Sequence, residues 1–249
     1  MAISYDSVEI LQGFADKYNI TYPLLSDEES TVIKSFGILN TNIYEGHEWY
    51  GVPFPGTYMV GKDGLVFNKS FEANHRIRES ANSMLQEDYK IQDAEHGEVQ
   101  IVNTDHFSAK AHLSSSTIRM GQLLTVTVEV LLNEEMHVYG RPLPEGYIPV
   151  ALTLEADETI EVNSIEYPEP AMMEFKVIQE QLPSYHGNFK IKARFRTMNE
   201  DPDDPFNIKA TLRYQACDSE QCYLPQTIVF TFPLKFLPHD WDLIEIDEK

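Results

Sequence analysis

Two patterns of apolar positions divide the chain. Over residues 1–90, short apolar runs alternate with segments in which apolar side chains recur at helical spacing. A helix is predicted over residues 6–18, where Asp6 or Ser7 can accept hydrogen bonds from the first amide groups. Strands interleaved with helices in this way predict an α/β domain.

Three more elements complete the expected domain. An acidic N-cap at Ser26–Glu29 opens a second, short helix. The Asp63–Gly64 pair suits left-handed turn positions and joins strands at 58–60 and 65–71 into a hairpin. A closing helix is predicted over residues 76–89.

Beyond residue 100 the helical period gives way to alternation with a period of two, as in residues 124–130. One-sided alternation is typical of strands with one face on a core and the other in water. About six to nine such strands, separated by polar turns such as Asp201–Pro205, predict an antiparallel β-sandwich over residues 100–238. The remaining expected parts are a polar linker at 91–99 and an acidic tail at 239–249.

Composition excludes several functions. The formal net charge of −21 argues against nucleic acid and anionic membrane surfaces as partners, since both attract clustered Lys and Arg. No run approaches the roughly 18 apolar residues of a membrane-spanning helix. No metal site or cofactor is expected, because the eight histidines lack ligand spacing and two cysteines cannot form an all-cysteine zinc site.

The candidate chemistry lies at Cys217 and Cys222, which are separated by the four polar residues Asp218–Gln221. A loop of this length brings two Cα atoms within the roughly 4.4–6.8 Å that a disulfide needs, and its polarity predicts exposure. Three interpretations remain open from these residues alone: a redox-active pair, a structural disulfide, and two unpaired thiols. A structural disulfide closing so short a loop would remove only about 2 kcal/mol of unfolded-state entropy.

Residues 100–235 resemble the N-terminal domain of the thiol:disulfide interchange protein DsbD, an immunoglobulin-like sandwich. The resemblance is carried by Tyr214–Cys217 and Cys222–Pro225, which match the segments that flank the family's cysteines. It implies a redox-active Cys217–Cys222 disulfide, with Tyr223 beside it. The loop between the cysteines is one residue shorter than in the best-known member.

The same resemblance implies supporting residues around the disulfide. The segment Met136–Tyr139 is similar to the family's aromatic run, with Tyr139 retained and His137 in place of an aromatic residue. Met173–Phe175 is similar to a cap loop in which Phe175 shields the pair. Glu174 is a candidate base and His137 a candidate proton shuttle, although a solvated carboxylate and a strand-end histidine are the ordinary roles of such residues.

Thiol chemistry then gives an expected mechanism. A thiolate of one cysteine attacks the disulfide of a partner, and the other cysteine resolves the mixed disulfide. Asp218 and Glu220 are expected to raise the thiol pKa values by like-charge repulsion. The expected partner is a thiol or disulfide protein, which the resemblance implies could be thioredoxin-like.

Residues 2–88 resemble the second part of a peroxiredoxin or redoxin domain of the AhpC/TSA type, with a thioredoxin fold. The resemblance is carried by Ala2–Asp6, Tyr22–Asp27 and Pro55–Val60, in family order and at family spacing. It implies a cis peptide bond at Phe54–Pro55 that faces the family's reactive cysteine. An ordinary turn proline is the alternative for Pro55.

The family's reactive residue lies upstream of the Ala2 strand, and this chain has no cysteine before residue 217. We therefore expect a truncated reading frame, with an incomplete thioredoxin-like segment followed by the sandwich. No export signal is visible, and the DsbD resemblance suggests the periplasm if the N-terminus is truncated.

The predicted function is thiol–disulfide exchange through Cys217 and Cys222, and a redoxin or peroxidase centre of the full-length protein is a candidate partner. Peroxidase activity is not expected from this chain alone. The alternative is a non-enzymatic immunoglobulin-like interaction module with a structural disulfide.

Overall fold

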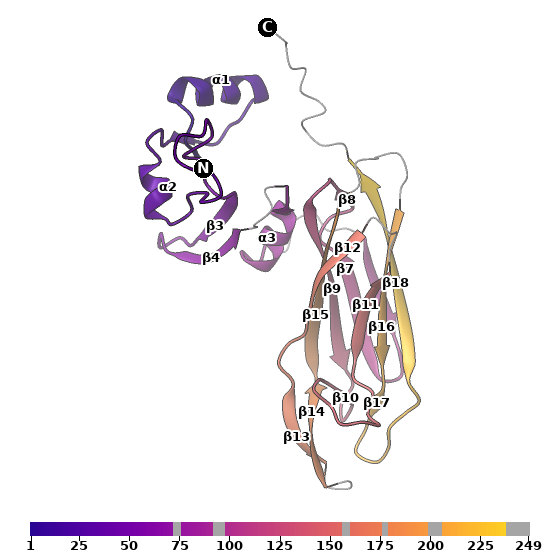
Figure 1. Ribbon diagram of the computed structural model, residues 1–249. Helices are drawn as coiled ribbons and strands as arrows, with labels where there is room; N and C mark the ends of the chain where they lie inside the picture. The colour runs from indigo at the N-terminus through magenta and orange to yellow at the C-terminus, as the bar shows by residue number, and fades with distance from the viewer. Residues whose placement is uncertain (72–75, 92–97, 156–159, 176–178, 199–205, 238–249) are drawn as a thin grey trace. The chain divides into compact units, whose positions relative to one another are not determined.

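The computed structural model describes residues 1–71, 76–91, 98–155, 160–175, 179–198 and 206–237. The chain forms two compact units, Met1–His75 and Arg76–Lys249, which are considered separately. Figure 1 shows the helix-containing first unit in indigo and violet and the β-rich second unit in magenta to yellow. The predicted combination of an incomplete thioredoxin-like segment with a β-sandwich is confirmed.

The first unit contains two short sheets. Strands β1 (Ala2–Ser4) and β2 (Leu24–Ser26) pair in parallel, as strands joined by a crossover helix do. Strands β3 (Gly56–Val60) and β4 (Val66–Phe71) pair antiparallel and form the predicted hairpin, with Gly64 at a φ of 80° in its turn. The two helices are α1 (Val8–Tyr18) and α2 (Thr31–Ser35).

Polar side chains cap the N-termini of both helices at the positions predicted from the sequence. Ser7 is the N-cap of α1, and its hydroxyl accepts a hydrogen bond from the Ile10 amide. The Asp27 carboxylate accepts hydrogen bonds from the amides of Thr31, Val32 and Ile33 at the start of α2. Burial opposes ionisation of Asp27, but these amides lower the pKa of its carboxyl group below the usual value. The acidic segment before α2 therefore caps this helix.

The peptide bond expected to be cis is trans. Among the described residues, the structure records a cis bond only at Arg141–Pro142. Pro53 bridges to Leu39, and Pro55 leads directly into β3. Trans is the lower-energy isomer by about 0.5–1 kcal/mol, and this extended path accommodates it. The prediction for Phe54–Pro55 was wrong.

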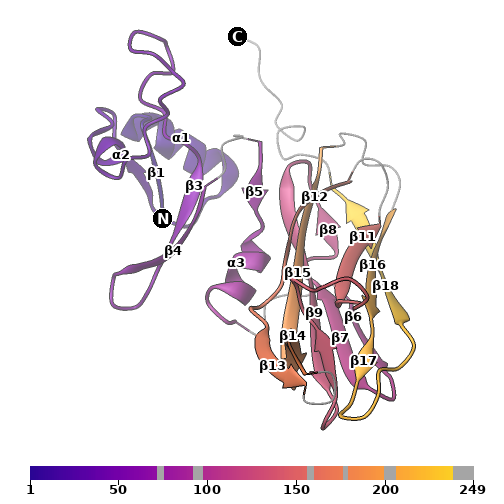
Figure 2. The same ribbon diagram turned by 60° about the horizontal axis from the view of Figure 1, so that its bottom comes forward.

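The described residues of the second unit form three sheets, whose strands can be followed in Figures 1 and 2. The largest has strand order β12-β15-β9-β7-β6, with β5 also paired to β9. The second has the order β11-β16-β18-β8, and the third, which carries the cysteines, has the order β13-β14-β10-β17. The elements are β5 (Arg78–Glu79), α3 (Ala81–Glu87), β6 (Val99–Asn103), β7 (Phe107–Leu113), β8 (Thr117–Ile118), β9 (Gln122–Leu132), β10 (His137–Tyr139), β11 (Ala151–Glu155), β12 (Ile160–Glu166), β13 (Ala171–Phe175), β14 (Glu180–His186), β15 (Asn188–Thr197), β16 (Phe206–Tyr214), β17 (Ala216–Cys217) and β18 (Gln226–Phe236).

The core lies mainly between the first and second of these sheets, and alternate positions of their strands supply it. Strand β18 shows the pattern clearly, since Ile228, Phe230 and Phe232 are buried while Val229 and Thr231 are exposed. The same alternation occurs along β15. Burial of one face on each strand is what the period-two pattern predicted. The further core residues on the predicted strands are Leu124, Val126, Val128, Val130, Phe189, Ile191, Ala193, Phe195, Ile208, Ala210, Leu212 and Tyr214.

Residues 76–91 belong to this second unit. Strand β5 pairs in parallel with the start of β9, where the Ser80 amide donates to the carbonyl oxygen of Leu123. Gly121 has a φ of 73°, and a Cβ atom there would lie 1.9 Å from the Arg76 carbonyl oxygen. The helix α3 that follows is shorter than the predicted helix over 76–89, because residues 78–79 are used for strand pairing.

Several predicted segments lie outside the described residues. They are most of the linker at 91–99, the turn at Asp201–Pro205 and the tail at 239–249. Within the described parts of the chain, no helix has the length and apolar character needed to cross a membrane.

Candidate functional site

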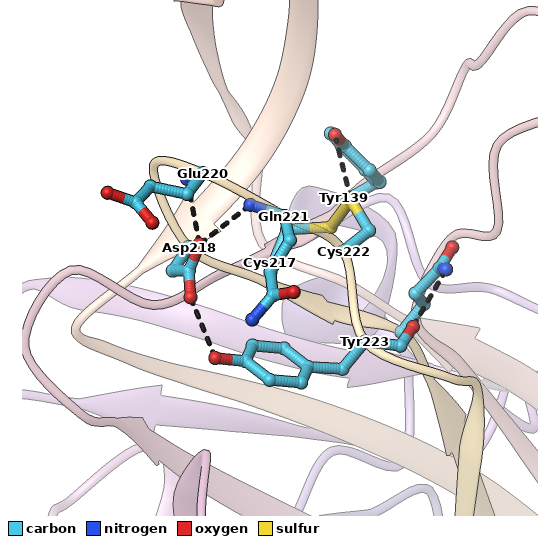
Figure 3. The surroundings of a disulfide bond; sticks show 8 residues. Tyr139, Cys217, Asp218, Glu220, Gln221, Cys222 and Tyr223 are labelled. Carbon is cyan, nitrogen blue, oxygen red and sulfur yellow. Dashed lines mark hydrogen bonds between the residues drawn. A yellow bond between two sulfur atoms is a disulfide. The ribbon is translucent and has the colours of Figure 1, made fainter.

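The two cysteines face each other across a tight antiparallel hairpin (Figure 3). The Tyr223 amide donates to the carbonyl oxygen of Ala216 at 2.9 Å, and the Asp218 amide donates to that of Gln221 at 2.9 Å. These bonds flank the Cys217–Cys222 pair, which therefore occupies a non-hydrogen-bonded position, where opposed side chains come closest. The cysteines form a disulfide with an S–S distance of 2.07 Å.

The Cα atoms of the two cysteines lie 4.0 Å apart, closer than the range expected from sequence. The reason is local, because a non-hydrogen-bonded pair in an antiparallel ladder has a Cα separation of only about 4.5 Å. The backbone hydrogen bonds close the hairpin on both sides of the disulfide. The disulfide therefore joins two residues that the strand pairing already holds together.

Asp218 organises the loop between the cysteines (Figure 3). Its Oδ1 accepts hydrogen bonds from the amides of Glu220 and Gln221, both at 2.8 Å, and its Oδ2 accepts one from the Tyr223 hydroxyl at 2.7 Å. The Tyr223 hydrogen bond, followed by the two amides, lowers the pKa of Asp218, and the same bond raises the pKa of Tyr223. Asp218 is thus a fixed negative charge next to Cys217.

The two sulfur-bearing residues differ in accessibility. Cys217 is 1% exposed and packs in a small cluster with Tyr139 and Leu182, whereas Cys222 is exposed. The exposure predicted for the loop therefore holds for Cys222 and fails for Cys217. Cys217 is buried because β17 pairs with β10, which brings this small apolar cluster over it.

Strand β10 brings two polar rings to the disulfide. His137 pairs in register with Cys217, so their side chains project from the same face of the sheet. Tyr139 lies two residues further along the same face, and its hydroxyl oxygen is 3.8 Å from Cys222 Sγ (Figure 3). Burial, with a smaller contribution from Glu180, raises the pKa of Tyr139.

His137 is 4% exposed, and its Nε2 has no hydrogen-bond partner among the described residues. Burial, reinforced by the neighbouring His186, lowers the pKa of His137 to about 4, against the smaller and opposite effect of Asp218. The imidazole is therefore neutral at neutral pH. His137 is the first residue of β10, so it lies at a strand end, and β10 itself lies between β14 and β17 in the sheet.

Phe175 covers this side of the site. Its ring centroid lies 4.7 Å from that of His137 and 5.8 Å from that of Tyr139, and the ring packs on the cluster that contains Cys217. Glu174 precedes it on β13 and is exposed, and adjacent residues of a strand point to opposite faces. The structure thus brings Phe175 to the disulfide and directs Glu174 away from it.

The structure gathers most of the site residues predicted from sequence. Tyr139, His137, Phe175 and Tyr223 surround the disulfide. Pro55 lies in the other compact unit. Sequence reasoning missed three contributors to the cluster that contains Cys217, and no local pattern marks them: Leu143, Tyr147 and Leu182.

Two protein families match the chain, each within a different one of the two compact units. The family described as "Thiol:disulfide interchange protein DsbD, N-terminal" matches residues 104–234, more than half of the chain, and the chain belongs to this family. The AhpC/TSA family matches residues 1–68. Both resemblances drawn from sequence are confirmed.

Two of the curated relatives that match part of the chain are peroxiredoxins. A putative peroxiredoxin bcp from Coxiella burnetii is 32% identical over 66 residues, which are 26% of this chain and 43% of the relative. The chloroplastic peroxiredoxin Q of Sedum lineare is 34% identical over 84 residues, 32% of this chain and 41% of the relative. The chain thus spans less than half the length of these two relatives.

Solved structures resemble the chain at low identity. The N-terminal periplasmic domain of ScsB from Proteus mirabilis has a TM-score of 0.39 at 14% identity, covering 60% of this chain and 56% of that one. The reduced DsbD N-terminal domain of Neisseria meningitidis has a TM-score of 0.32 at 15% identity, covering 44% and 77%. A complex of the DsbD and PilB N-terminal domains from the same organism has a TM-score of 0.30 at 15% identity, covering 43% and 73%.

Proposed function

We propose that the second unit exchanges its Cys217–Cys222 disulfide with the dithiol of a partner protein. The observation that carries this proposal is the difference in accessibility between the two cysteines, one exposed and one buried in an aromatic cluster. A redoxin-like and a DsbD-like region in one chain, together with this disulfide, also indicate thiol–disulfide chemistry. A partner of the redoxin class is the leading candidate, because the same chain carries an AhpC/TSA region.

The exposed sulfur determines the first step. A partner thiolate attacks Cys222 Sγ and forms a mixed disulfide with it, while the Cys217–Cys222 bond breaks and Cys217 leaves with the electron pair as a thiolate. A second thiolate of the partner then attacks its own sulfur in the mixed disulfide, and Cys222 leaves. The products are the dithiol form of this chain and the disulfide form of the partner.

The position of the disulfide argues against a purely structural role. Closing a loop of this length contributes only about 2 kcal/mol in the chain-entropy account. The backbone hydrogen bonds on both sides of the pair and the three hydrogen bonds to Asp218 already hold the hairpin. Reduction therefore leaves the surrounding structure supported, as a disulfide that opens and closes requires.

Single cysteine variants test the proposal. The probe is a thioredoxin whose reactive cysteine carries a disulfide-linked leaving group. Cys217→Ser leaves the exposed thiol of Cys222, which is expected to displace this group and accumulate a mixed disulfide. Cys222→Ser is the matched control, because the buried thiol that it leaves should form little of this species. Equal trapping by both variants, or an oxidised wild-type protein that a reduced thioredoxin does not reduce, would refute the proposal.

An interaction module with a structural disulfide is the second candidate, and the burial of Cys217 favours it. The reduction potential separates the two functions. Exchange requires a potential above about −300 mV, whereas a structural disulfide has a lower value. Equilibration of the full chain with glutathione and dithiothreitol buffers measures it.

A further inference from the structure

His137 is a buried titratable side chain beside the disulfide that the mechanism above does not use. His137 is 4% exposed, has an unpartnered Nε2 among the residues described, and lies directly across the β10–β17 pairing from Cys217. A buried polar group without a hydrogen bond costs free energy, and a role in another state of the protein is one reason to retain it. The state that changes here is the redox state of the neighbouring cysteine.

We propose that His137 accepts a proton when the disulfide opens and holds the Cys217 thiolate as a thiolate–imidazolium pair. This inference rests on the proposed exchange at the same disulfide and adds a residue that assists it. The leaving sulfur is the buried one, so its negative charge develops away from solvent, where an uncompensated charge is costly. An imidazolium at His137, which pairs in register with Cys217, offsets the cost of the buried thiolate charge.

The step balances in atoms and charge. The partner thiol, ionised by solvent, supplies the attacking thiolate, and the electron pair of the broken S–S bond stays on Cys217 Sγ. Neutral His137 takes one proton from solvent as that charge forms. The reverse reaction returns the proton when Cys217 attacks the mixed disulfide.

Burial, reinforced by a neighbouring histidine, keeps His137 neutral before the disulfide opens. His186 of β14 pairs with it in register at a ring-centroid distance of 6.0 Å and disfavours a second positive charge. Asp218 favours the charged form, but burial outweighs it. Tyr139 and Phe175 pack on the ring at centroid distances of 5.4 Å and 4.7 Å. A new thiolate at Cys217 adds the missing negative charge.

Nuclear magnetic resonance titration of histidine-labelled full-length protein tests the inference without any protein partner. In the oxidised protein the pKa of His137 is expected at about 4, and in the dithiothreitol-reduced protein it is expected to rise toward or above the ordinary value of 6.5. Reduced Cys222→Ser should keep the raised pKa because Cys217 remains, whereas Cys217→Ser should not. The same His137 pKa in both redox states would overturn the inference.

The rate of disulfide reduction by dithiothreitol near neutral pH gives a second test. We expect His137→Phe to slow this reaction by roughly tenfold to a hundredfold, at the low end of general acid–base effects. His137→Gln can donate a hydrogen bond but cannot take a proton, so an intermediate rate is expected. His47→Phe, in the first unit, is the control and should react at nearly the wild-type rate.

The outcomes separate this inference from the proposed function. His137→Phe reduced at the wild-type rate would refute the role of His137, while exchange with thioredoxin through Cys222 would still support the proposed function. Exchange that fails for the wild-type protein would refute the proposed function, whatever the histidine titration shows. Circular dichroism of His137→Phe and His137→Gln establishes that a slow rate does not come from unfolding.

Discussion

Replacing His137 by phenylalanine should remove an acid-sensitive part of the stability of the oxidised sandwich. The folded protein holds the pKa of His137 at about 4, against 6.5 in the unfolded chain. Between these two values the unfolded state binds more protons than the folded state, so the free energy of unfolding falls as pH falls. Stability is fully present above about pH 6.5 and the loss is complete below about pH 4.

The magnitude follows from the size of the shift. A change of one pKa unit corresponds to about 1.4 kcal/mol, so the whole effect is about 3 kcal/mol. His137 is 4% exposed, and solvent screening therefore removes little of this value. Such a loss is a large fraction of the stability of an ordinary domain.

Urea unfolding of the oxidised protein, followed by the circular dichroism of the β-sheets over a series of pH values, measures this effect. Carboxylates also titrate in this range, and their contribution cancels in the difference between the unfolding free energies of wild type and His137→Phe. The variant is expected to lose less stability than wild type as pH falls through the interval from 6.5 to about 4. A stability difference that stays constant with pH would refute the reasoning, and His47→Phe in the first unit is the control.

Three further predictions follow from packing and backbone geometry. Phe230→Ala removes a fully buried ring of β18 and should lower the free energy of unfolding, measured by denaturant titration, by about 3–5 kcal/mol. Val229→Ala at the adjacent exposed position should change this free energy by less than about 0.5 kcal/mol. Gly121→Ala places a methyl group against the Arg76 carbonyl oxygen at a positive φ and should lower the free energy of unfolding by more than about 1–2 kcal/mol. Gly13→Ala in the open interior of α1 should instead stabilise the first unit by roughly 0.5–1 kcal/mol, and equal effects of the two variants on thermal unfolding would contradict this. Asp218→Ala removes the acceptor for two loop amides, so hydrogen exchange at Glu220 and Gln221 should accelerate, and unchanged protection would show that the carboxylate does not order the loop.

Elements that depend on local chemistry could be predicted from the sequence. Ser7 caps α1, and Asp27 accepts hydrogen bonds from the first amides of α2, because both roles require only a short polar side chain at the start of a helix. The alternation along β18 gave its buried face for a similar reason, since side chains of a strand alternate between two faces.

Features that depend on distant pairing could not be predicted. The polar loop at Asp218–Gln221 indicated exposure for both cysteines, but β10, some eighty positions earlier in sequence, pairs with β17 and buries Cys217. The segment that contains β5 has a weak local signal, and its pairing with β9 appears only when the sheet is assembled. The same holds for His137, whose burial depends on its neighbours in β14 and β17.

The unequal burial of the two sulfurs also bears on oxidative damage. The backbone hydrogen bonds of the hairpin do not require the S–S bond, so we expect Cys217 to stay within its aromatic cluster when the pair is reduced. Peroxides and alkylating reagents then meet Cys222 first, because irreversible oxidation follows accessibility as well as thiolate character. A sulfenic acid formed at Cys222 has the sheltered thiol of Cys217 directly opposite it. Condensation of the two would restore the disulfide and release water, so we expect the pair to return to the disulfide before oxidation of Cys222 becomes irreversible.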